Sequence, residues 1–188
     1  MTSKKVRVRS APSPTGHDLK LPAPEPLVDH AWSYFSDRLP PRDEAPDAVR
    51  EWFARLLDLF APAVDNLEQF PAKSAFLFGF DPDAARTIAE NAVVLSADSA
   101  RTVLAEFAGR VRAHAGRVRL EDFSRWMNEI QAATGVKGNA LFQPVRIALT
   151  GQHSGPDLAR LVRLIEDGAA LGLGVPSVCG RVERFVGV

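Results

Sequence analysis

Apolar residues recur at helical spacing through most of this chain, and this spacing is the strongest constraint on its fold. Over residues 47–60 the apolar side chains fall three or four positions apart, which places them on one face of an α-helix. The same period follows over 96–114 and 120–134. Apolar residues alternate over 76–80, but three alternating positions are weak evidence for a strand. We therefore predict an all-α protein.

Proline positions divide the chain. Five prolines between residues 11 and 26 predict an extended, non-helical N-terminal tail. A short helix is expected over 27–39, closed by two prolines. We predict three parts: a proline-rich tail over 1–28, a helical subdomain over 29–94 and a C-terminal helical subdomain over 95–188.

Capping residues predict where one central helix begins. Asp81 is followed by a proline, a combination typical of a helix start. We expect that helix to run to about Val94. Its apolar residues Ile88, Ala92 and Val93 are expected to face the core.

Composition limits the function classes. The chain has 23 Lys and Arg and 23 Asp and Glu, so its formal net charge at pH 7 is zero, which argues against strong autonomous binding to nucleic acid. The single cysteine, Cys179, excludes an internal disulfide and a cysteine-based zinc site. The four histidines lack metal-ligand spacing, and no apolar run suits a membrane span or a signal peptide. We expect a soluble, cytoplasmic protein with no metal, cofactor or membrane partner.

The segment 141–158, LFQPVRIALTGQHSGPDL, carries the most specific signal. Pro144 is expected in the first turn of a helix, where its missing N–H costs nothing, and Gly151 is expected to end that helix. Ser154 or Gly155 is expected to cap the next helix, with a proline just inside it. These signals alone describe an ordinary corner between two helices.

The order of identities in this segment resembles a run near the C-terminus of bacterial glutamyl-tRNA synthetases, where it joins two helices of the anticodon-binding region. The resemblance covers about residues 29–188. It implies a helical bundle like the anticodon-binding cage domains of that family, preceded by an extended tail. It also favours an irregular packed loop over 76–80.

Residues 6–16, VRVRSAPSPTG, resemble the opening of the same synthetases, just before their ATP signature. By this resemblance Arg9 and Ser13 match positions that help to hold the amino-acid substrate. The ATP signature is broken, because Leu19 stands where the phosphate-contacting histidine belongs, and no Lys-Ser-Lys type loop or glycine-rich phosphate cradle follows. We therefore predict a truncated relative with no catalytic residue and no enzymatic activity on its own.

Arginines are dense between residues 101 and 125, which makes this segment locally basic. The resemblance implies that such helices read anticodon bases, and arginine suits both stacking on bases and hydrogen bonding to them. Arg146 equally suits a structural role, pinning a helix end, and single arginines on a solvated face are common. The candidate RNA-binding residues are Arg101, Arg110, Arg112, Arg117, Arg119, Lys137, Arg146 and Gln152.

The leading hypothesis is a non-catalytic protein, related to glutamyl-tRNA synthetase, that binds tRNA of the glutamate or glutamine type weakly, either alone or as an accessory to a full ligase. The alternative, favoured by the neutral charge, is a protein-interaction module that docks a synthetase or another protein. A shared basic face would favour RNA, and an exposed apolar patch would favour a protein partner.

Overall fold

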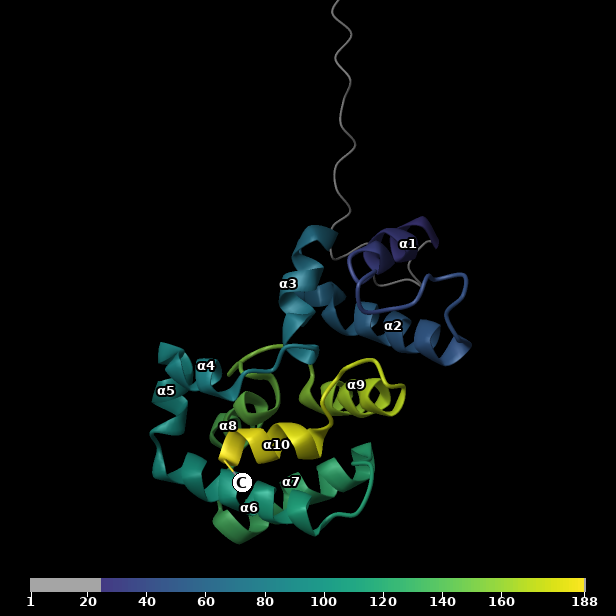
Figure 1. The fold of residues 1–188 in the computed structure, drawn as a ribbon. Coiled ribbons are helices and arrows are strands. Elements are labelled where there is room, and N and C mark those ends of the chain that lie inside the picture. The colour runs from purple at the N-terminus through teal and green to yellow at the C-terminus, as the bar shows by residue number, and fades with distance from the viewer. Residues whose placement is uncertain (1–24, 188) are drawn as a thin grey trace, which may run out of the picture.

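The computed structural model describes residues 25–187, and every regular element in that part is helical (Figure 1). The all-α prediction is confirmed. The α-helices are α1 (Glu25–Ser33), α2 (Asp47–Phe60), α3 (Phe70–Ser74), α4 (Pro82–Thr87), α5 (Ala89–Leu95), α6 (Asp98–Ala113), α7 (Leu120–Thr134), α8 (Asn139–Thr150), α9 (Leu158–Ala170) and α10 (Val178–Val186). Short 3-10 turns η2 (Ala61–Ala63), η3 (Leu67–Gln69) and η4 (Ala75–Leu77) connect α2 to the loop before α4.

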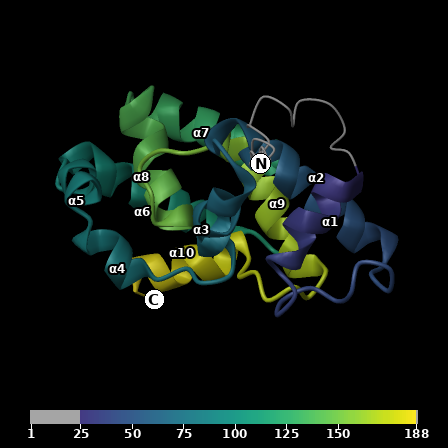
Figure 2. The same cartoon turned by 90° about the horizontal axis from the view of Figure 1, so that it is seen from above.

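The helices form two groups with α9 between them (Figures 1 and 2). Helices α1, α2 and α3 lie together at one end, and α4 to α8 with α10 form the other group. Helix α9 contacts α2 in the first group and α7 in the second, while α10 lies against α6 and α8. One apolar core runs through both groups from Ala31 to Val182. The division at residues 94 and 95 stays a prediction.

The contact between α2 and α9 depends on a tryptophan and a glycine. Trp52 is fully buried, and its indole N–H donates to the carbonyl oxygen of Leu164 at 2.8 Å. A Cβ atom on Gly168 would lie 3.0 Å from Trp52 Nε1 and 3.0 Å from Val175 Cγ2. Because only a hydrogen atom fits there, Gly168 lets the indole pack directly on the α9 backbone.

Several predicted helices are confirmed. The helices predicted over 47–60 and 120–134 have those bounds, because their apolar faces are continuous and buried. The helix predicted over 27–39 begins at Glu25, within the stretch predicted to be extended, ends at Ser33 and is followed by turns. The segment 76–80 is a 3-10 turn and a loop, as the family resemblance favoured.

The prediction of one helix after Asp81 is wrong. Asp81 does cap α4, but Ile88 is extended (φ −67°, ψ 123°) and separates α4 from α5. Ile88 is 42 % exposed and Val93 is 74 % exposed. Ala92 is exposed as well, so the prediction that these three residues face the core is wrong.

A buried amide holds this break in place. The side chain of Asn91 is fully buried, and its Nδ2 donates to the carbonyl oxygens of Ala85 at 2.7 Å and Gly151 at 2.8 Å. The Ala85 carbonyl lies in the last turn of α4, where no helical N–H reaches it. Asn91 therefore ends α4 and ties the break to the turn after α8.

Helix α8 begins earlier than predicted. It starts at Asn139 after Gly138, whose φ of 62° lets the chain turn. Pro144 consequently lies inside the helix, and the expectation that it occupies the first turn is wrong. Its missing N–H leaves the carbonyl group of Ala140 without the usual helical partner. Gly151 ends α8 in the left-handed conformation, as predicted.

The cap of α9 also differs from the prediction. Asp157, and neither Ser154 nor Gly155, caps the helix by accepting a hydrogen bond from the backbone N–H of Arg160 at 2.7 Å. Pro156 lies before the helix. A carboxylate is a stronger acceptor for the unpaired N–H groups of a first turn, and it complements the helix dipole.

A buried arginine on α10 joins three parts of the fold. Arg181 is fully buried, and its guanidinium donates to four backbone carbonyl oxygens. The acceptors are Pro176 (2.9 Å from Nε), Leu149 (2.8 Å), Phe76 (3.1 Å) and Leu77 (2.5 Å). Burial lowers the pKa of Arg181 to about 9, which leaves it charged at neutral pH.

We expect Arg181→Met to lower the free energy of unfolding by about 2–4 kcal/mol, because four buried carbonyl groups lose their donor. Urea denaturation followed by tryptophan fluorescence measures the change. Arg184→Met is the control, since Arg184 lies exposed on the same helix. Equal stability of the two variants would contradict this account of Arg181.

Candidate nucleic-acid interface

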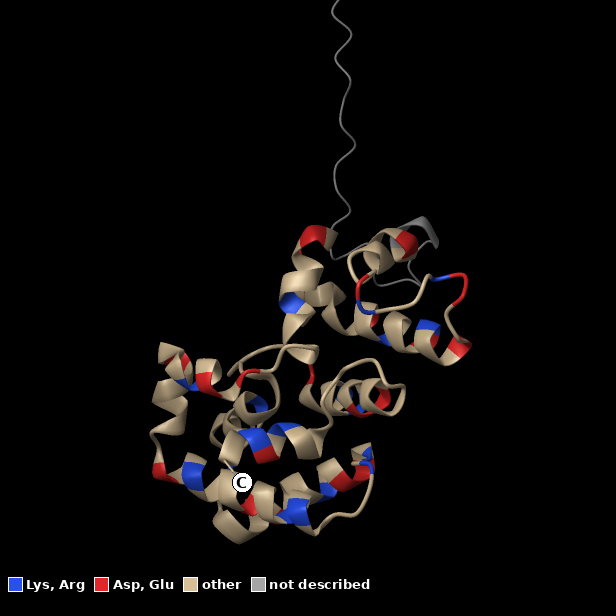
Figure 3. Ribbon diagram, in the orientation of Figure 1, with Lys and Arg blue, Asp and Glu red and all other residues tan. Residues whose placement is uncertain are grey.

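The arginines of the basic segment do not share one face. Arg110 and Arg112 lie almost opposite each other on α6, because two residues correspond to about 200° of rotation. Arg101 and Arg112 lie on nearly the same side of α6, since a separation of eleven residues corresponds to about three helical turns. Basic and acidic residues are interspersed along the ribbons (Figure 3). The arginines therefore divide into separate sets.

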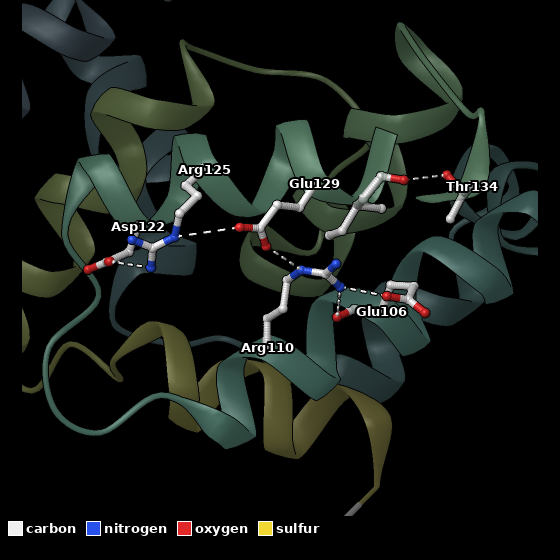
Figure 4. A network of polar contacts seen from close by, with 7 residues as sticks. Glu106, Arg110, Asp122, Arg125, Glu129 and Thr134 are labelled. Carbon is white, nitrogen blue, oxygen red and sulfur yellow. Dashed lines mark hydrogen bonds and ion pairs between the residues drawn. The ribbon is translucent and has the colours of Figure 1, made fainter. Parts of the chain in front are cut away.

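Arg110 links α6 to α7 (Figure 4). It donates to the carboxylates of Glu106 at 2.6 Å and Glu129 at 3.2 Å, and to the backbone carbonyl of Glu106 at 3.0 Å. Arg125 extends the network from Asp122 at 2.8 Å towards Glu129 at 3.8 Å. The hydrogen bond to Glu106 raises the pKa of Arg110 above its ordinary value. Arg110 thus serves the packing of α6 on α7.

Arg101 and Arg112 lie on the other side of α6. Arg101 forms an ion pair with Asp98 in the first turn of the helix. Arg112 is exposed and forms no ion pair within the part of the chain that the structure describes. Of the three α6 arginines, Arg112 is therefore the one whose charge no described residue neutralises.

Different stability effects are expected on the two sides of α6. Arg110→Ala should lower the free energy of unfolding by about 1 kcal/mol, because a network of ion pairs between two helices is lost. Arg112→Ala should leave stability within about 0.5 kcal/mol of the unaltered protein. Thermal or urea denaturation of both variants measures these changes in the free energy of unfolding. A larger loss of stability for Arg112→Ala than for Arg110→Ala would refute the structural role given to Arg110.

Arg117 and Arg119 belong to the loop between α6 and α7. They line an open groove of about 920 Å³ with His114, Arg163 and Asp167. Arg117 forms an ion pair with Asp167, which Arg163 also approaches, with its Nε at 3.7 Å. The groove therefore contains both signs of charge.

Asp122 organises the other wall of this groove. Its Oδ2 accepts a hydrogen bond from the backbone N–H of Arg119 at 3.2 Å, and Arg125 and His114 lie close to its carboxylate. The backbone hydrogen bond, followed by the positive charge of Arg125, lowers the pKa of Asp122. The carboxylate thus fixes the backbone at the start of α7.

This lowered pKa predicts a pH dependence. A carboxyl group whose pKa is lower in the folded state stabilises the fold above about pH 4, and that stabilisation disappears as pH falls through the lowered pKa. Asp122→Asn should be less stable than the unaltered protein at pH 7 and equally stable in strong acid. Glu121→Gln, an exposed neighbour, is the control. Urea denaturation across pH measures both; a pH-independent difference for Asp122→Asn would contradict the prediction.

The segment 141–158 forms the end of α8, a turn and the start of α9. Arg146 donates from NH1 to the carbonyl oxygen of Pro156 at 2.8 Å, and burial lowers its pKa. Thr150 Oγ1 accepts a hydrogen bond from the Gln152 N–H at 3.0 Å. Arg146 therefore has the structural role of holding the turn, and its contact with RNA stays a prediction.

The structure places the remaining candidates as follows. Lys137 is exposed just after α7, and the side chain of Gln152 is exposed in the turn between α8 and α9. Arg9 and Ser13 lie outside the described residues. None of these placements tests whether the residues bind RNA.

Arg163 was missed by reasoning from the sequence. It lies on α9, and its guanidinium reaches the groove of Arg117 and Arg119 only because α9 packs against α7. Arg163 lies far in the sequence from the arginine-dense segment 101–125, so the local density of arginines could not identify it. The available signal was its spacing of four residues from Asp167 on a helix.

Residues 25–187 contain no group of three or more His, Cys, Asp or Glu side chains arranged to hold a metal ion. None of the described helices is both long and apolar enough to cross a membrane.

The helical domain is of the anticodon-binding class. The family described as "Anticodon binding domain" matches residues 26–171, so the chain belongs to this family. This match confirms the family resemblance drawn from the 141–158 segment.

The individual relatives are glutamate–tRNA ligases. The chain is 30% identical over 115 residues to the ligase of Natranaerobius thermophilus, a match that covers 61% of this chain and 23% of the relative. It is 24% identical over 167 residues to glutamate–tRNA ligase 1 of Caldicellulosiruptor saccharolyticus, covering 89% of this chain and 32% of the relative. It is 47% identical over 66 residues to the ligase of Sulfurihydrogenibium sp., covering 35% and 12%. The chain thus spans about a third or less of these curated relatives.

Proposed function

We propose that this protein binds tRNA of the glutamate or glutamine type in the cytoplasm and does not aminoacylate it. The match of residues 26–171 to the anticodon-binding-domain family carries the proposal. The broken ATP signature in the sequence supports the non-catalytic part, because amino-acid activation needs several positive groups converging on one phosphate. The protein acts on tRNA alone or beside a full ligase.

The RNA-contacting groups in this proposal are the candidates at the two ends of α7 whose charge is not used within the fold. Arg119 and Lys137 are exposed, and no ion pair within the described part of the chain engages either one. They flank opposite ends of α7, so a bound RNA would run along this helix, which is about 22 Å long. Gln152, exposed in the turn after α8, supplies an amide for hydrogen bonds to a base edge.

The neutral net charge sets the expected strength of binding. With 23 basic and 23 acidic residues, the long-range attraction to phosphates is weak. Affinity therefore depends on a few local contacts and falls steeply as salt is raised. Arg110, Arg117 and Arg146 contribute less, because carboxylates or backbone carbonyls already engage them.

Binding to a glutamate tRNA transcript, measured by fluorescence anisotropy across a salt series, tests the proposal. We expect Arg119→Ala/Lys137→Ala to weaken binding and to reduce the slope of log affinity against log salt by about one for each lost phosphate contact. Lys73→Ala is a matched control, since it removes an exposed positive charge from α3 in the other helical group.

Three results would count against this proposal. Absence of binding at low salt would remove tRNA as the ligand. Binding that Arg119→Ala/Lys137→Ala leaves unchanged would move the RNA site away from α7. Exchange of pyrophosphate into ATP in the presence of glutamate by this chain alone would overturn the non-catalytic assignment.

A further inference from the structure

Residues of α4, α5, α6 and the C-terminal end of α10 line a second groove, away from the network of Arg110. Its volume is about 780 Å³. The apolar lining includes Leu95, Leu104 and Val186, and three arginines surround it, Arg86, Arg101 and Arg112. We call it the arginine-rimmed groove.

The lining of this groove carries charge of one sign. Asp and Glu are absent from the residues that line it. Arg86 and Arg101 pair with Asp83 and Asp98 within their own helices, whereas Arg112 forms no ion pair in the described part of the chain. The free positive charge therefore lies at the Arg112 end, beside apolar side chains.

Exposed apolar residues continue the groove onto α5. Ala92 belongs to the lining, and the adjacent Val93 is 74 % exposed. Val94 and Leu95 pack partly against the core cluster of Ile147 and Phe185, whereas packing within the described part of the chain does not account for Ala92 and Val93. An apolar surface beside a positively charged rim suits a partner that is apolar in the middle and acidic at its edges.

The chemistry of the lining favours a peptide over RNA. Bases of single-stranded RNA are held by stacking on exposed aromatic rings. The aromatic residue in this lining, Phe185, is only 3 % exposed, and the Arg86 guanidinium already lies 4.7 Å from its ring centroid. The remaining apolar lining is aliphatic, which suits the insertion of aliphatic side chains from an amphipathic helix.

We propose that the arginine-rimmed groove docks an acidic amphipathic helix from a partner protein. Aliphatic side chains of that helix enter between α5 and α6, and its carboxylates pair with Arg112 and Arg101. These arginines are eleven residues apart on α6, roughly 16 Å along the axis, which matches about three turns of a bound helix. The proposal is independent of tRNA binding, because it uses the side of α6 opposite Arg110.

Selection from a displayed library of random peptides of about 16 residues, long enough for four helical turns, tests the proposal. We expect enrichment of acidic peptides with aliphatic residues three and four positions apart. Their affinity, measured by fluorescence anisotropy, should fall by about tenfold in Arg112→Glu, which reverses a rim charge. It should fall similarly in Ala105→Glu, which places a carboxylate on an exposed position of the groove. Ala132→Glu, exposed on α7, is the control.

Four outcomes would overturn the proposal. Absence of enriched peptides, enrichment of basic peptides, or affinity that Arg112→Glu and Ala105→Glu leave unchanged would each exclude an acidic helix as the occupant. Binding of a uridine-rich oligonucleotide that Ala105→Glu abolishes would identify the groove as an RNA site instead. Loss of peptide binding in Arg112→Glu with unchanged tRNA binding would separate this groove from the proposed tRNA function.

Discussion

The Arg181 guanidinium donates to backbone carbonyls from three places: the turn after α3, the end of α8 and the loop before α10. Carbonyl groups at helix ends lack helical partners, and burying them without a donor is costly. One planar cation satisfies several at once, which allows the loops between the two helical groups to be buried. The position of the turn after α8, where Gln152 is exposed, depends on this arrangement because Leu149 is one of the acceptors.

Most of the arginine charge is used inside the fold. Arg110 joins α6 to α7, Arg117 and Arg163 converge on Asp167, and Arg146 holds the turn before α9. The net charge is zero because basic and acidic residues are equal in number, and these contacts explain why the arginines of the basic segment form no single basic face. Among the candidate RNA-binding residues, those that form no ion pair in the described part of the chain include Arg119 and Lys137 at the ends of α7 and Arg112 in the arginine-rimmed groove.

Most features that depend on interactions between neighbouring residues were predicted correctly from the sequence, whereas features that depend on residues distant in the sequence were missed. Helices α2 and α7 were predicted with their observed bounds, because a continuous apolar stripe depends only on neighbouring residues. The break at Ile88 was missed, since it depends on Asn91 binding the carbonyl of Gly151, a residue distant in the sequence. The candidate arginines were likewise found by local density, but their separation onto two sides of α6 required the helix geometry.

The sequence by itself determined the helical class, the family signature in the 141–158 segment and the neutral charge. These properties follow from the order and kind of residues alone, and they do not depend on how the helices pack. The tertiary structure alone decided which arginines pair with carboxylates or carbonyl groups and which polar side chains are buried in the core. It also decided where α8 and α9 begin. Those outcomes depend on carbonyl groups and carboxylates that meet only when distant helices pack together, so no local pattern encodes them.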